Sequence, residues 1–165
     1  MTLAEAAAEA DGLAASGDQT ALAALRKQWD EEIEHAARSA DYRIRAQAYR
    51  AIAQFRFRQK LELVRRGLQD ESPAARGSAL ISLEAFSRDH PGDVNSMRSL
   101  LHELASNDPN LAVRRLAIIC LKNGSPQRET ILVLNGLADD DEADAELRKT
   151  AKTIAAALTK RSNTR

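Results

Sequence analysis

The stretch NDPNLAVRRLAIICL, residues 107–121, combines a turn with the start of an amphipathic helix. The Asn-Asp-Pro sequence at residues 107–109 is typical of a helix start, because Asn and Asp side chains accept hydrogen bonds from free amides and proline is tolerated in the first turn. Val113, Ala117 and Leu121 follow at intervals of four residues, so they share one face of the predicted helix. The small alanine at the centre of this face allows a second helix to pack closely.

The same pattern occurs four times along the chain. It consists of an apolar residue, an arginine, two variable residues, an alanine, three variable residues and a further apolar or small residue. The four arginines are Arg45, Arg76, Arg114 and Arg148, so successive copies are 31, 38 and 34 residues apart. A period of about 30 to 40 residues predicts two helices and two turns in each repeat.

The composition favours helices throughout. The chain of 165 residues is 44% hydrophobic and only 4% aromatic, and 7 glycines and 4 prolines offer few positions that stop helices. Alternating runs of Val, Ile, Thr and aromatic residues, which a sheet would need, are missing. The sequence therefore predicts an all-α protein.

Leucine-rich segments precede each copy of the pattern and predict the first helix of each pair. Short polar links are expected at residues 56–59, 87–94 and 123–127. Residues 1–19 are expected to form either a capping helix or a frayed one, and residues 161–165 a flexible tail. About nine helices result, eight of them in four pairs at residues 20–56, 59–88, 94–123 and 127–160.

The repeated pattern and its Asp/Pro turns resemble the HEAT repeat, including the HEAT-like variant of phycobilin lyases. The resemblance covers about residues 20–160, and it is weakest in the fourth copy, where Ala155 replaces a large apolar residue. It implies a right-handed α-α superhelix, a solenoid of the HEAT-like or armadillo type. It also implies that Asp and Arg side chains link neighbouring repeats and that the second helix of each pair lines the concave side.

Charge and targeting signals predict a cytoplasmic protein. The 24 basic and 24 acidic residues cancel, so there is no overall attraction to nucleic acid or anionic lipid. Residues 1–17 lack the basic and apolar regions of a signal peptide. Cys120 is the one cysteine and cannot form a disulfide within the chain, which fits a reducing compartment.

A surface for a protein partner is predicted on the second helices. When the four copies are superposed, two columns lie beside the core positions: Tyr49, Leu80, Ile118 and Lys152 in one, and Arg50, Ile81, Ile119 and Thr153 in the other. At least one column should face partly outward, and the alternative is that both are buried between repeats. The predicted partner-binding residues are Tyr49, Arg50, Ile81 and Ile119, which suit a peptide or helix.

The segment of residues 38–66 supports an alternative function, nucleic-acid binding. It is rich in arginine interleaved with aromatic residues, and the candidate phosphate contacts are Arg43, Arg50, Arg56 and Arg58. HEAT-like DNA glycosylases that remove alkylated bases are the comparison, because they use a basic cleft with aromatic residues. The competing interpretation is that these bases are solvated and paired with the acids of residues 30–34.

No catalytic, metal or cofactor site is predicted. His102-Glu103 is similar to the His-Glu pairs of HEAT-like hydroxylases, but those enzymes need several pairs and this chain has one. Cys120 and Trp29 lie within apolar helix patterns and are expected in the core. The sequence thus predicts a non-enzymatic protein-interaction module, an adaptor or scaffold, without a cofactor or a membrane contact.

Overall fold

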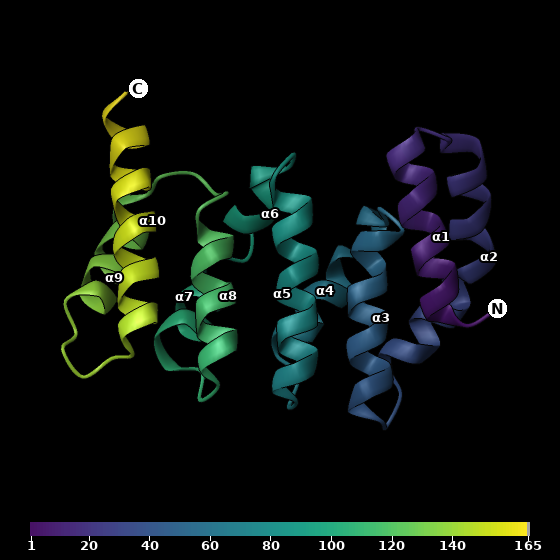
Figure 1. The fold of residues 1–165 in the computed structure, drawn as a ribbon, viewed down its shortest axis with the longest axis horizontal. Helices are drawn as coiled ribbons and strands as arrows, with labels where there is room; N and C mark the ends of the chain where they lie inside the picture. Colours follow the sequence, from purple (N-terminus) through teal and green to yellow (C-terminus); the bar gives the residue numbers. More distant parts are fainter. Residues whose placement is uncertain (165) are drawn as a thin grey trace. The chain divides into compact units, whose positions relative to one another are not determined.

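The computed structural model describes residues 1–164, which form ten α-helices and one 3₁₀ helix and contain no strand (Figure 1). The all-α class is therefore confirmed. The elements are α1 (Leu3–Ser16), α2 (Gln19–Ala37), α3 (Tyr42–Gln54), η1 (Arg58–Lys60), α4 (Leu61–Leu68), α5 (Pro73–Ser87), α6 (Pro91–Asn95), α7 (Arg98–Asn107), α8 (Leu111–Leu121), α9 (Arg128–Ala138) and α10 (Ala145–Asn163).

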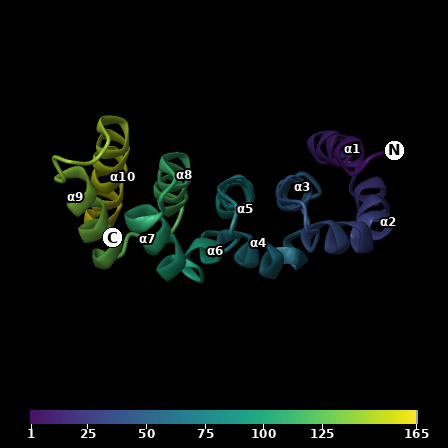
Figure 2. The same cartoon turned by 90° about the horizontal axis from the view of Figure 1, so that it is seen from below.

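The chain forms two compact units, Met1–Phe86 and Ser87–Arg165. In the first unit α2 packs on α3, α1 packs on both, and α3 contacts α4. Figure 2 shows α3 and α5 along one side of this unit and α2 and α4 along the other. In the second unit α7 packs on α8 and α9, and α10 packs on α8 and α9. Packing between neighbouring helices is the arrangement of an α-solenoid, as the sequence predicts.

The N-terminal residues form an ordered helix, which is the capping alternative of the sequence prediction. The Thr2 hydroxyl accepts a hydrogen bond from the Glu5 amide while the Glu5 carboxylate accepts one from the Thr2 amide, so α1 begins with a capping box. Three alanines of α1 are buried. Gly17 ends the helix with φ of 79°, a left-handed conformation that glycine adopts without strain.

The repeated arginines cap the ends of the first helices. Arg76 Nη1 donates to the Asp70 carbonyl at 2.9 Å, and Arg114 Nε donates to the Ala105 carbonyl at 2.9 Å. Arg45 Nη1 donates in the same way to the carbonyls of residues 39 and 40, at 3.0 and 3.1 Å. Carbonyls at a helix end have no partner within the helix, so a guanidinium from the next helix satisfies them. This contact explains why arginine recurs in the pattern.

An ion pair between Arg45 and Asp70 joins the first two repeats, as the resemblance implies. Arg45 Nε and Nη2 donate to the two carboxylate oxygens of Asp70 at 2.8 and 2.9 Å. The two side chains are only 11% and 7% exposed. The bidentate geometry makes this the strong form of a carboxylate–guanidinium contact.

Two expectations about element boundaries were wrong. The polar link expected at residues 87–94 contains α6, because Pro91 starts a helical turn and Val94 is buried on its inner side. The tail expected from residue 161 is helical to Asn163. Arg161 donates to the carbonyls of Lys122 and Gly124 at 2.7 and 2.9 Å, which holds this last turn in place. Residue 165 of the predicted tail lies outside the described residues.

Candidate functional site

In one of the two predicted columns all four residues are exposed or half-buried, and in the other three of the four are buried. Tyr49, Leu80 and Ile118 are buried, so the prediction that Tyr49 contributes to a partner surface is wrong. In the second column Arg50 is exposed, and Ile81 and Ile119 are half-buried. The alternative that both columns are buried is therefore wrong as well.

Tyr49 is only 1% exposed because its ring packs against a glycine of α4. A Cβ added to Gly67 would lie 3.0 Å from Cδ2 of Tyr49 and 2.7 Å from Cβ of Ala79. Only glycine leaves room for this close approach. Burial also raises the pKa of the Tyr49 hydroxyl. The sequence contained one signal of this packing, namely a glycine inside the amphipathic pattern of α4.

Arg50 and Ile81 belong to helices that contact each other in the first unit. The Ser82 hydroxyl donates to the Tyr49 carbonyl at 2.5 Å, which joins α3 to α5 one residue away from both side chains. Arg50 has no hydrogen bond or ion pair with any described residue, so its guanidinium is available to a ligand. Ile119 lies on α8 in the second unit.

The four candidate phosphate contacts are not equally free. Arg43 donates to the Asp41 carboxylate at 3.2 Å and lies over the Tyr42 ring. Its hydrogen bonds lower the pKa of Asp41 below the usual value. Arg56 pairs with Asp11 of α1 at 2.8 Å. Arg50 is exposed on α3, and Arg58, which is exposed on η1, also interacts with another residue of the chain.

Other bases of residues 38–66 pair with the acids of α2, as the competing interpretation expected. Lys60 donates to Asp30 at 2.6 Å and to Glu34 at 2.8 Å, although its side chain is buried. Burial alone would lower the pKa of Lys60, but these two carboxylates raise it. Arg38 also donates to Glu34, at 2.6 Å. Much of the positive charge in this segment is therefore neutralised within the unit.

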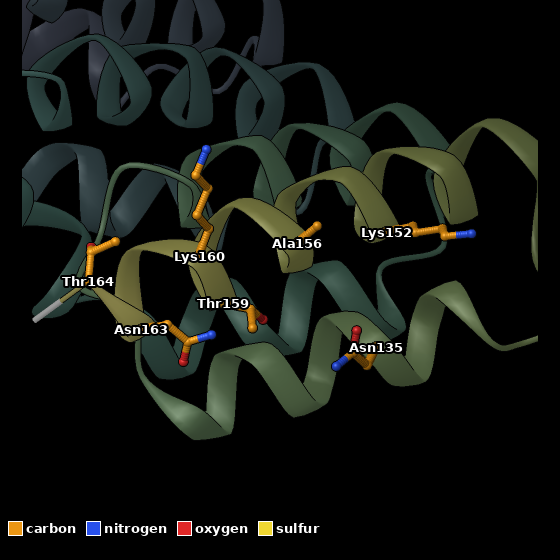
Figure 3. A pocket seen from close by; sticks show the side chains of 7 residues that line it. All are labelled: Asn135, Lys152, Ala156, Thr159, Lys160, Asn163 and Thr164. Atoms are coloured by element: carbon orange, nitrogen blue, oxygen red, sulfur yellow. The ribbon is translucent and has the colours of Figure 1, made fainter.

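Two surface hollows were not foreseen from the sequence. One of about 530 Å³ lies between the first turns of α3 and α5, and its lining includes Tyr42, Arg45 and Pro73. The other, of about 570 Å³, lies between α9 and α10. Figure 3 shows Asn135 of α9 on one side of it and Thr159 and Asn163 of α10 on the other. Both hollows depend on the distance between two helices, which no local sequence pattern specifies.

A buried polar cluster joins α6, α7 and α9. Arg98 is only 7% exposed, and its Nη1 donates to the Thr130 hydroxyl at 2.6 Å. Its Nη2 donates to the side-chain carbonyl of Asn95 and, at 3.2 Å, to the main-chain carbonyl of Ser125. No described carboxylate forms an ion pair with Arg98. His102 Nε2 lies 2.9 Å from the same Thr130 hydroxyl.

The predicted core residues lie where the sequence placed them. Cys120 is fully buried and Trp29 is buried on α2. The residue after His102, Glu103, accepts a hydrogen bond from Asn107 instead of joining the histidine in a ligand set. Within residues 1–164 no group of three or more His, Cys, Asp or Glu side chains could hold a metal ion.

The stability of the second unit is expected to fall as His102 becomes protonated. Burial lowers the pKa of His102 below its ordinary value of 6.5; Glu129 opposes this shift and Arg98 adds to it. Below about pH 6.5 the unfolded chain therefore binds a proton that the folded chain does not, and the free energy of unfolding decreases until the folded pKa is reached. Urea unfolding of the wild type should show this loss, and His102→Gln should lack it. Parallel pH profiles for the two proteins would contradict the prediction.

Comparison with known families identifies the repeats. Residues 30–103, from the second half of α2 to α7, match the family model described as HEAT repeats. The match confirms the resemblance to the HEAT repeat in the first two copies of the pattern, and the phycobilin-lyase detail is not confirmed. A search of curated proteins found no match to the chain. No helix within residues 1–164 has both the length and the apolar character needed to cross a membrane.

Proposed function

We propose that this chain is a non-enzymatic module that binds a protein partner through the second helices of its repeats. HEAT repeats generally serve as protein-interaction modules and are typically non-enzymatic. The residues proposed to contact the partner are Arg50 and Ile81 in the first unit and Ile119 in the second. A cytoplasmic location and the absence of a cofactor are part of the same proposal.

The observation that carries this proposal is the outward-facing column of the second helices. Arg50 is exposed and without an intramolecular partner, and the half-buried Ile81 lies on the neighbouring helix. An arginine beside an apolar side chain is a frequent anchor at protein interfaces, because it combines directional donors with apolar area that can be removed from water. These two residues therefore suit a partner that presents a carboxylate next to an aliphatic side chain.

Nucleic-acid binding receives less support from the same surface. A phosphate that approached Arg43 or Arg56 would have to displace Asp41 or Asp11, and each of these carboxylates already neutralises the guanidinium. Affinity for nucleic acid depends largely on basic side chains that displace the counterions condensed on the phosphates, and an arginine already paired with a carboxylate loses much of that gain. We therefore treat nucleic-acid binding as an outcome that the experiment can detect.

The test is a pull-down from lysate with tagged wild type, Arg50→Glu and Ile81→Asp, each with and without nuclease. We expect a stoichiometric protein that survives nuclease and whose recovery falls at least about tenfold with Arg50→Glu, because a repulsive charge replaces the anchor. Lys27→Glu, which reverses the charge of an exposed residue on α2, is the control and should retain binding. Circular dichroism should show that each variant is folded.

Two results would overturn the proposal. Equal recovery with wild type and both variants would remove this surface from the interaction. Recovery of nucleic acid, with all proteins lost after nuclease treatment, would assign residues 38–66 to phosphate binding instead.

A further inference from the structure

The surface of α9 and α10 that faces away from the core is exposed and has a distinctive composition. Leu132 is 59% exposed on α9. Gly136 lies one turn further along, and a Cβ added to it would meet no atom within 4 Å. On α10, Lys152, Ala156 and Lys160 recur every four residues and are all exposed. We call this surface the outer face. It consists of Leu132 and Gly136 on α9 and of Lys152, Ala156 and Lys160 on α10.

The lysines of the outer face have no partner within the chain. Neither Lys152 nor Lys160 forms an ion pair or hydrogen bond with a described residue, and α10 contains no acid after Glu146. Both side chains belong to the lining of the hollow between α9 and α10, where Lys152 and Lys160 extend from the α10 ribbon (Figure 3). The α10 side of the outer face is therefore positively charged.

The opposite charge lies at one end of the same helix pair. The loop between α9 and α10 includes Asp139 and Glu142, which are exposed and whose carboxylates form no ion pair with a described residue. Asp144 caps the start of α10. At a rise of about 1.5 Å per residue, Lys152 lies about 12 Å and Lys160 about 24 Å from this acidic end. The outer face is therefore acidic at the end formed by the α9–α10 loop and basic along α10.

We propose that the outer face binds the outer face of a second copy of this chain in an antiparallel, two-fold arrangement. A two-fold axis brings the acidic loop of each copy toward the lysines of the other, so this attraction occurs twice in the dimer. The small residues Gly136 and Ala156 allow the helices to approach closely, and the exposed Leu132 is removed from water. This inference is independent of the proposed function, which uses α3, α5 and α8.

The experiment is sedimentation equilibrium of the full chain and of two charge-reversed variants. One variant carries Lys152→Glu and Lys160→Glu, which makes both ends of the outer face acidic. The other carries Asp139→Lys and Glu142→Lys, which changes the net charge of residues 139–144 from −5 to −1. We expect the wild type to dimerise and each variant alone to associate at least about tenfold more weakly. The lysine reversals place acids opposite acids across the axis, and the loop variant loses most of its attraction for the lysines. An equimolar mixture of the two variants should recover a heterodimer.

Salt and a matched control distinguish this surface from any other. Raising the salt from about 0.05 M to about 0.5 M should weaken the wild-type dimer severalfold, because exposed charges are screened over shorter distances. Lys27→Glu on α2 shifts the net charge in the same direction as the lysine reversals, by half as much, and should leave the dimer intact. A wild type that is monomeric throughout overturns the proposal, as does a dimer unaffected by the lysine reversals. Failure of the folded variants to form a heterodimer would also overturn it.

Discussion

Replacing Arg98 with alanine is expected to lower the free energy of unfolding by about 3 kcal/mol, because buried hydrogen bonds to a charged group are lost and their acceptors stay buried. The side chain is 7% exposed and joins Asn95, Ser125 and Thr130, which belong to three different segments of the second unit. The alanine side chain is too short to reach these three acceptors. Part of the loss is offset, since the alanine variant no longer buries a guanidinium.

Urea unfolding of the full chain measures this effect. Arg115→Ala is the matched control, because Arg115 is exposed on α8 and forms no hydrogen bond or ion pair with a described residue. The control should change the free energy of unfolding by no more than about 0.5 kcal/mol. If Arg98→Ala were equally mild, the cluster would contribute little and the second unit would be held together by its apolar core alone.

Asp70→Ala should cost the first unit about 2 to 3 kcal/mol, because it removes a bidentate, largely buried contact. Arg45 would then keep its two bonds to main-chain carbonyls but lose its counter-charge. The Ser72 amide would also lose its acceptor, since Asp70 Oδ1 accepts from it at 2.9 Å. Asp70→Asn should fall between the wild type and the alanine variant, because an amide oxygen can still accept from Ser72.

The effect of Asp70→Ala should depend on pH in a defined direction. Burial alone would raise the pKa of Asp70, but the hydrogen bonds from Arg45 and Ser72 bring it below its ordinary value of 3.8. The stabilisation is therefore complete above pH 3.8 and is lost as the pH falls through the folded pKa. Glu71→Ala is the control, because Glu71 is almost fully exposed and lies 3.8 Å from Arg45. Equal losses from both variants would contradict the assigned role of Asp70.

The helices were largely predictable because their signals are local. The spacing of Val113, Ala117 and Leu121 identifies a buried helix face, and all three residues are fully or almost fully buried in α8. Turn residues mark approximately where helices start: the cap of α8 is Asn110, directly after the predicted turn at residues 107–109, and Asp144 caps α10. The short α6 was missed because a helix of five residues is too short to show a repeating pattern.

The candidate surface was predictable only in part. The superposed columns correctly placed Arg50 outside, yet they placed Tyr49 with it, and Tyr49 is buried. Neighbouring helix positions differ by only about 100°, so the boundary between the buried and exposed sides depends on where the adjacent helices lie. For Tyr49 that boundary is decided by Gly67, a residue of another helix that leaves space for the ring.

By itself the sequence determined the all-α class, the repeat, the HEAT resemblance and the buried apolar faces, because each depends on periodicity along one helix. Tertiary structure alone decided which charges are free. Arg56 and Lys60 are paired with Asp11 and Asp30 of other helices, and Arg50, Lys152 and Lys160 have no partner among the described residues. The physical reason is that an ion pair needs two side chains within about 4 Å, and the helices that bring them together are separated by up to 45 residues of chain.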